Sequence, residues 1–167
     1  MKKVGAITLA LVMIAMLSLP VSAMSIQEIS TLDLRTPSGY TIKQLEGGLL
    51  KGLAPLSDQF IYAEKYYGVN AVFLAAVSAL ESGWGQSGWS KYNNIFGYGN
   101  KMRFESKEQC IFTVSGAISR NYLSPDGRYF KGYTVDAVNR YYNGRDEWSK
   151  AVKGIMRDII RRIERSA

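Results

Sequence analysis

Apolar residues recur every three or four positions in several segments of the chain, which is the spacing of amphipathic helices. One such segment runs from 56 to 67, a second from 111 to 122 and a third from 148 to 163. Residues 71–80 differ because a serine is their single polar residue, and a helix that is apolar on every side belongs in the middle of a core. Alternation with period two is weak and confined to the region around 98–105. The pattern therefore predicts an all-α domain.

Helix-start and helix-stop residues bracket these segments. Thr41 with Gln44, and Ser106 with Gln109, have the spacing of a capping box. Further residues that favour helix starts are Ser57 or Asp58, Asn70 and Thr134, and glycines at 47–48 and 68 favour helix ends. The last helix has acidic residues at its start and arginines at its end, as the helix dipole prefers.

Residues 1–23 have the pattern of a secretory signal peptide. Lys2 and Lys3 precede an uncharged, largely apolar run over 4–19, and Val21-Ser22-Ala23 is a small-residue cleavage site. An uncleaved membrane anchor is the alternative, because the run approaches the roughly 20 residues that cross a bilayer. We expect residues 24–40 to form a short N-terminal arm and residues 41–167 to form one catalytic domain.

Composition excludes several kinds of chemistry. The chain has no histidine and a single cysteine, Cys110, so Ser-His-Asp and Cys-His catalysis, an internal disulfide and a thiolate metal cage are ruled out. We expect no metal and no cofactor, and acid–base chemistry must use carboxylates, tyrosine or lysine. Signal removal would lower the net charge from +7 to +5, because it removes two lysines. That charge favours anionic wall polymers as partners, or it merely aids solubility; we expect no nucleic-acid partner.

Glu81 is the residue best placed for chemistry. It follows the apolar helix and precedes Ser82-Gly83-Trp84-Gly85, so its side chain is expected to emerge where the core opens. Burial, the negative end of the helix dipole and a neighbouring indole such as Trp84 would all help it to keep its proton. A protonated acid can donate to a leaving-group oxygen. The alternative is an ordinary helix-end carboxylate that faces solvent.

The sequence around Glu81 resembles a known family. Residues 73–87, FLAAVSALESGWGQS, followed by Asn93-Asn94-Ile95-Phe96-Gly97, are similar to the signature of the bacterial glucosaminidases, glycoside hydrolase family 73 in the lysozyme superfamily. Residues 63–70 and 142–156 extend the likeness over most of the mature chain. The resemblance implies an all-α, lysozyme-like helical domain with at most a minimal β-hairpin beside the cleft.

The resemblance also implies an activity. It is hydrolysis of the β-1,4 bond after N-acetylglucosamine in peptidoglycan glycan strands, with Glu81 as the general acid. Tyr142, which begins a Tyr-x-x-x-x-x-Trp spacing, matches a tyrosine that lies near the scissile sugar in relatives. Many relatives carry a second acid on a hairpin; here Glu105 is the nearest candidate, although Glu108 and a substrate-assisted route through the 2-acetamido group stay open.

Five further residues are candidates for substrate binding. Asn94 and Phe96 are expected to shape the floor of the cleft, and Trp84, Tyr92 and Tyr98 to stack on sugar faces. For each of them a purely structural role is the alternative, as a turn former or a core residue.

Three other functions stay open at this stage. A muramidase or a lytic transglycosylase would cut the other bond of the same glycan, and a peptidoglycan-binding protein would hold the glycan without turnover. We expect a secreted, cell-wall-associated autolysin, or a membrane-anchored protein facing outward if the signal segment is retained.

Overall fold

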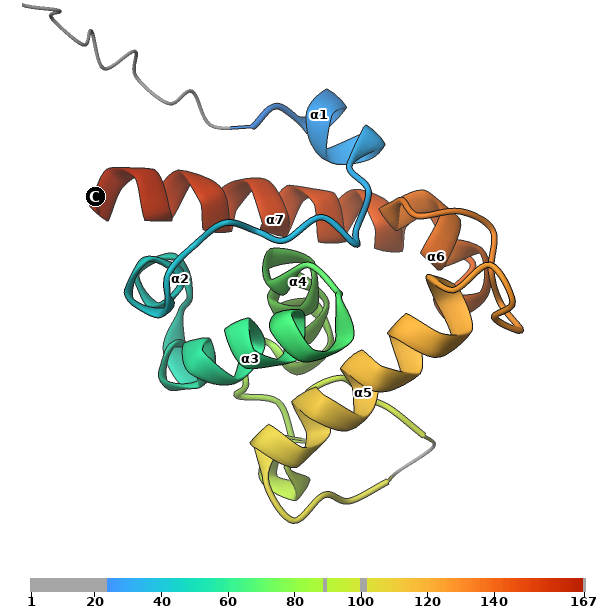
Figure 1. Ribbon diagram of the computed structural model, residues 1–167. Coiled ribbons are helices and arrows are strands. Elements are labelled where there is room, and N and C mark those ends of the chain that lie inside the picture. Colours follow the sequence, from blue (N-terminus) through green and yellow to red (C-terminus); the bar gives the residue numbers. More distant parts are fainter. Residues whose placement is uncertain (1–23, 89, 100–101, 167) are drawn as a thin grey trace, which may run out of the picture.

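The computed structural model describes residues 24–88, 90–99 and 102–166, and the predicted signal segment, 1–23, lies outside that part. The described residues form helices joined by loops (Figure 1). In chain order they are α1 (Ile26–Thr31), α2 (Ile42–Gly48), η1 (Lys51–Leu56), α3 (Ser57–Tyr67), α4 (Ala71–Ser82), η2 (Ser90–Tyr92), α5 (Lys107–Tyr122), α6 (Val135–Tyr142) and α7 (Asp146–Ser166).

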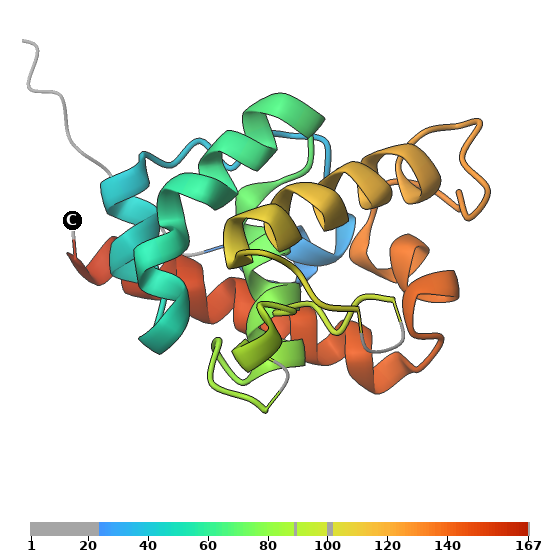
Figure 2. The same ribbon diagram turned by 90° about the horizontal axis from the view of Figure 1, so that it is seen from below.

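The helix α4 is the centre of the molecule. Every residue from Ala71 to Ala79 is buried, as the apolar run predicted. Helices α3 and α7 pack against it, and α5 packs against α3, so that α4 is enclosed (Figures 1 and 2). The enclosed position explains why its sequence has no polar face.

The helix α7 runs along one side of this core. Its buried residues lie on one stripe: Trp148, Ser149, Val152, Met156, Ile159, Ile160 and Ile163. Helices α1, α2, α4 and α6 pack against α7. Because α7 contacts both the central helix and α6, it brings the end of α4 and the end of α6 to the same place, where the site is formed.

The predicted helix boundaries are confirmed at most positions. Thr41 and Gln44 form the expected capping box, and Asn70 and Thr134 cap α4 and α6 through their side chains. Ser106 caps α5, but the Gln109 side chain accepts a hydrogen bond from the backbone N–H of Glu105 instead of completing a capping box. Gly68 ends α3 in the left-handed conformation, with φ 64°.

The N-terminal arm contains a helix that the apolar pattern did not predict. Ser25 and Glu28 form a capping box at the start of α1, and Ile29 is fully buried. Beyond α1 the arm joins the domain, since the backbone N–H of Leu34 donates to Tyr133 and its carbonyl accepts from Asn70. The arm is therefore part of the folded unit.

The described residues contain no strand, so the fold is all-α, consistent with the lysozyme-like helical domain that was expected. The weakly alternating segment around 98–105 is a loop in its described part. Nor does the part of the chain described here include a helix with the length and apolarity that a membrane span requires.

Candidate active site

Glu81 lies in the last turn of α4, where the central helix leaves the core. Gly83 ends the helix with a left-handed backbone, φ 56°. The buried Ser82 hydroxyl donates to the carbonyl of Ser78 and accepts from the N–H of Gly85, at 2.6 and 2.7 Å. These bonds fix the turn after the helix, and the partly buried side chain of Glu81 points into a cleft as predicted.

The Glu81 carboxyl group is held from one side by α7. The indole N–H of Trp148 donates to Glu81 Oε1 at 2.8 Å. On the other side, a Cβ placed on Gly97 would lie 3.7 Å from Glu81 Oε2, so that oxygen faces the backbone of the 94–97 loop. The two oxygens thus have different surroundings: Oε1 accepts a hydrogen bond from an indole, and Oε2 lies near Gly97, which also lines the cleft.

The cleft has two parts that meet at Glu81 and Asn143. The first part, of about 300 Å³, is also lined by Phe96, Gly97, Tyr98, Gly99, Ala117, Ile118, Tyr122 and Tyr142. The second part, of about 420 Å³, is also lined by Leu80, Arg145, Glu147, Trp148 and Ala151. A ligand that occupied both parts would therefore have Glu81 beside it in each of them.

Tyr142 lines the first part of the cleft together with Glu81, and its place near a scissile sugar stays a prediction. Its ring lies 5.0 Å from the ring of Trp148 and 5.8 Å from that of Tyr122, measured between centroids. Burial raises the pKa of Tyr142 far above its ordinary value, and the nearby Glu81 carboxylate adds to the effect. The hydroxyl group therefore stays protonated and acts as a neutral donor or acceptor.

Asn94, Phe96 and Tyr98 form one wall of the cleft in different ways. Phe96 and Tyr98 line it directly. Asn94 is buried and binds the loop itself: its amide donates to the carbonyls of Tyr98 and Met102, and its carbonyl accepts from the N–H of Tyr98. Asn94 therefore fixes the loop that forms this wall, and a direct contact of Asn94 with a substrate stays a prediction.

Trp84 and Tyr92 are not among the described residues that line either part of the cleft. The Trp84 ring lies under the guanidinium of Arg162 at 4.9 Å, and the indole beside Glu81 is that of Trp148. Tyr92 lies near Lys91 and Arg103, whose charged groups are 5.0 and 4.3 Å from its ring. Sugar stacking on these two rings stays a prediction.

Glu105 is exposed and lies outside both described parts of the cleft. Its backbone N–H binds Gln109 and its carbonyl accepts from the amide of Asn93. The other candidate acid, Glu108, is in the first turn of α5, and hydrogen bonds from its own backbone N–H and from Ser106 hold its pKa below the usual range.

Several residues of the cleft are not predicted as site residues by the sequence. Among them, Tyr122 and Trp148 lie in the predicted helical segments 111–122 and 148–163, Glu147 is one of the acids at the start of the last helix, and Asn143 carries no signal. The Tyr-x-x-x-x-x-Trp spacing did link Trp148 to Tyr142, but nothing in the local sequence connects Trp148 to Glu81. Only the packing of α7 on α4 brings them together.

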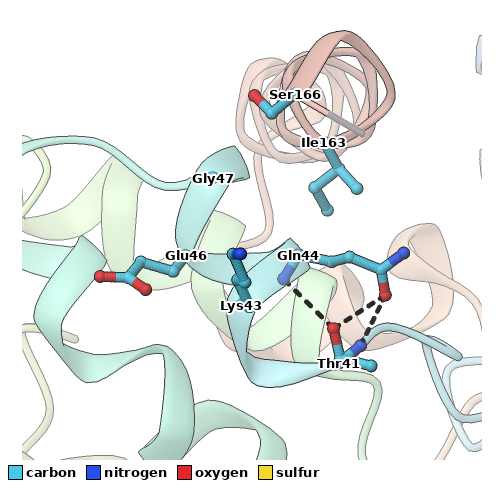
Figure 3. Close-up of a pocket in the computed structure, with 7 residues that line it drawn as sticks. All are labelled: Thr41, Lys43, Gln44, Glu46, Gly47, Ile163 and Ser166. Atoms are coloured by element: carbon cyan, nitrogen blue, oxygen red, sulfur yellow. Dashed lines mark hydrogen bonds between the residues drawn. The ribbon is translucent and has the colours of Figure 1, made fainter.

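A separate cavity of about 530 Å³ lies between α2 and the end of α7, as Figure 3 shows. Two of its polar side chains are already hydrogen-bonded to each other, because Thr41 donates to the Gln44 side chain in the cap of α2. The Glu46 side chain is directed away from Gln44 in Figure 3. The described residues that line this cavity include no tyrosine and no carboxyl group held by an indole, in contrast to the cleft at Glu81.

The sequence of the chain is similar to a known family and to known proteins. Residues 57–161 match the family model described as glucosaminidase, mannosyl-glycoprotein endo-beta-N-acetylglucosaminidase. Two proteins, from Streptococcus pneumoniae serotype 4 and a second strain of that species, carry the name "Putative endo-beta-N-acetylglucosaminidase" and are 32% identical over 113 residues. The match covers 62% of this chain but 17% and 16% of theirs. The matched region includes the whole of the cleft described above, and the chain belongs to the glucosaminidase family.

Proposed function

We propose that the protein hydrolyses the β-1,4 bond after N-acetylglucosamine in peptidoglycan glycan strands, with Glu81 as the general acid. One observation carries the proposal: the Glu81 carboxyl group lies where the two parts of an extended cleft meet, fixed by Trp148 through one oxygen. Family membership supports the glycosidase reaction, and the names of the two streptococcal proteins support the N-acetylglucosamine side of the bond.

The chemical step needs a proton on the glycosidic oxygen. Glu81 Oε2, which lies near Gly97 in the wall of the cleft, would give its proton to that oxygen as the C1–O bond breaks. The Trp148 N–H holds Oε1 and so fixes the direction of the other oxygen. Positioned acid catalysis of this kind contributes typically about 10²–10⁴-fold to the rate.

The positive charge that develops at C1 needs a second group. Glu147 lines the second part of the cleft together with Glu81, and they are its two carboxylates among the described residues. Glu147 is exposed in the first turn of α7, and its carboxyl group would act there as a base or a charge stabiliser. The 2-acetamido group of the substrate is the alternative.

Tyr142 would position the substrate and not exchange a proton. Its hydroxyl group stays neutral because its pKa is raised by burial, so it can orient the acetamido group or the attacking water through a hydrogen bond. The contact between Tyr142 and Trp148 links this orienting group to the residue that fixes Glu81.

Product analysis on purified cell wall tests the proposal. The wild-type chain should release fragments that end in reducing N-acetylglucosamine, and Glu81→Gln should abolish the release. Reducing N-acetylmuramic acid would indicate a muramidase, and anhydro-sugars a lytic transglycosylase. Pelleting with insoluble peptidoglycan without new reducing ends would indicate a binding protein. Full lytic activity of Glu81→Gln would overturn the role of the acid.

Localisation at the cell wall is part of the same proposal. It depends on residues 1–23 acting as a signal, and on the net positive charge favouring anionic wall polymers. Analysis of the N-terminus of the exported chain would distinguish cleavage after Ala23 from a retained anchor.

A further inference from the structure

A row of tyrosine rings leads from the cleft to the surface of the protein. Tyr122 lines the cleft, and its ring centroid lies 5.1 Å from that of Tyr129. Tyr129 in turn lies 5.6 Å from Tyr141, which is 53% exposed. The row is therefore continuous with the cleft at one end and open to solvent at the other.

The loop that carries Tyr129 is held in place before any ligand binds. It connects α5 to α6 and projects at one end of the molecule in both ribbon views (Figures 1 and 2). The N–H groups of Gly127 and Tyr129 donate to the carbonyls of Ser124 and Asn121, both at 2.8 Å. A Cβ at Gly127 would lie 2.6 Å from the carbonyl oxygen of Asn121, so glycine is required for this close approach.

Two cations lie over the outer rings of this row. The Arg128 guanidinium is 5.3 Å from the Tyr129 ring and the Lys131 ammonium is 5.6 Å from the Tyr141 ring. Both side chains are exposed, and neither forms an ion pair with a carboxylate of the described residues. The loop also contains Asp126, so its cations exceed its acids by one.

We propose that Arg128, Tyr129, Lys131 and Tyr141, here called the tyrosine rim, bind the acidic part of the glycan strand beyond the sugars at Glu81. The inference rests on the proposed function. Tyrosine rings offer apolar faces and edges to the C–H faces of sugars, and the two cations complement carboxylates carried by the strand. The rim would therefore favour long, carboxylate-bearing strands over short or uncharged ones.

Binding measurements on the inactive Glu81→Gln chain test the rim directly. The probes are peptidoglycan strands with their stem peptides and an uncharged N-acetylglucosamine oligomer of the same length. Adding Tyr129→Ala should lower the affinity for both probes by about 10-fold. Adding Arg128→Gln and Lys131→Gln should lower the affinity for the acidic strand by about 3-fold to 10-fold and reduce the salt dependence of its binding. The affinity for the uncharged oligomer should stay unchanged.

Matched controls lie on α2 and α3, outside the loop between α5 and α6 and outside α6. Tyr66→Ala removes a tyrosine that is 76% exposed on α3, and Lys43→Gln with Lys65→Gln removes two exposed cations. These variants should bind both probes as the Glu81→Gln chain does. The proposal would be overturned if the rim variants bound both probes with unchanged affinity. It would also be overturned if removal of the two cations lowered the affinity for both probes equally.

Activity of the chain with Glu81 intact separates this inference from the proposed function. On long wall strands, Tyr129→Ala should lower kcat/KM by about 10-fold, whereas on fragments too short to reach the rim it should leave kcat/KM unchanged. If the wild-type chain releases no reducing ends from either substrate, the proposed function fails. If it cleaves both and the rim variants match it on both, the rim alone fails.

Discussion

The hydrogen bond between Trp148 and Glu81 joins residues that are 67 positions apart in the sequence. Trp148 is 6% exposed, and its indole N–H donates to Glu81 in this largely buried position. A hydrogen bond to a carboxylate is worth more than one between neutral groups, about 1.5–3 kcal/mol. Much of the precise placement of the acid is therefore expected to depend on this single donor.

Trp148→Phe keeps an aromatic ring against Tyr142 but removes the donor. We expect kcat to fall by about 10-fold to 100-fold, because Glu81 loses its fixed orientation. The smaller ring should also lower the free energy of unfolding by roughly 2 kcal/mol. Kinetics on wall glycan and denaturant unfolding measure the two effects.

The control for this variant is Val152→Ala, one turn further along the buried stripe of α7. It should lose a similar amount of stability, roughly 2 kcal/mol, without lowering kcat at a temperature where the protein stays folded. An equal loss of kcat in both variants would mean that stability, and not the hydrogen bond, governs activity.

Tyr142→Phe tests whether the hydroxyl group orients or titrates. Since the pKa of Tyr142 is raised above its ordinary value, its neutral form persists through the working range of pH. The substitution should lower kcat by about 10-fold, the effect of one lost hydrogen bond, and leave the alkaline side of the pH–rate profile where it was. A shift of that alkaline limb would show that the phenol itself gains or loses a proton during catalysis.

The sequence predicts the acid better than it predicts the acid's surroundings. Glu81 stands out because an apolar helix ends there, and this is a local pattern. Trp148 and Glu147 reach the same cleft only because α7 packs along α4, and Asn143 reaches it at the end of α6, which packs on α7. No local spacing reveals these contacts between distant segments. Trp84 shows the converse: it is adjacent to the acid in sequence, but its ring lies under Arg162.

At the scale of elements, the helix boundaries follow from capping chemistry and are predicted well. Thr41, Asn70, Ser106 and Thr134 each accept a backbone N–H at the start of a helix. The helix α1 was missed because its six residues contain too few apolar positions to show a period, although its capping box is visible in the sequence. Its place against α7 is a tertiary effect.

The buried carboxylate of Glu64 ties three of these elements together. It accepts from the N–H groups of Ser38 and Ala71, both at 2.7 Å, and from the Ser38 hydroxyl at 3.2 Å. The arm, α3 and the first turn of α4 therefore meet at one side chain that is 7% exposed. Because α4 carries Glu81 at its other end, this anchor supports the position of the acid.

Glu64→Gln keeps the shape of the side chain and removes its charge. Because both backbone N–H groups bind Oε2, the amide oxygen can take that place, and the amide NH2 group then faces the Ser38 hydroxyl. We expect the free energy of unfolding to fall by about 1–3 kcal/mol, because hydrogen bonds to a neutral acceptor are worth less than hydrogen bonds to a carboxylate. Glu46→Gln, at an exposed position of α2, is the control and should change stability by less than about 0.5 kcal/mol. Equal unfolding midpoints for the two variants would contradict an anchoring role.

For the whole molecule, the arrangement of the helices decides which carboxylates can act on one substrate. The end of α4 supplies Glu81, and the start of α7 supplies Glu147 to the same part of the cleft. The loop that carries Glu105 lies elsewhere on the surface. Among the described residues, Glu147 is therefore the carboxylate that shares a part of the cleft with Glu81, and a catalytic role for Glu105 stays a prediction.

Glu147→Gln distinguishes a carboxylate partner from a substrate-assisted route. If Glu147 stabilises the charge at C1 or activates water, the substitution should lower kcat by about 10²-fold or more with little change in KM. Asp146→Asn is the matched control, because Asp146 lies in the same first turn of α7 but lines a different cavity, with Asp136 and Asn139. Near wild-type kcat in Glu147→Gln would instead favour the acetamido route. In that case substrates that lack the N-acetyl group should not be cleaved, whereas an enzyme that uses a carboxylate partner should still cleave them slowly.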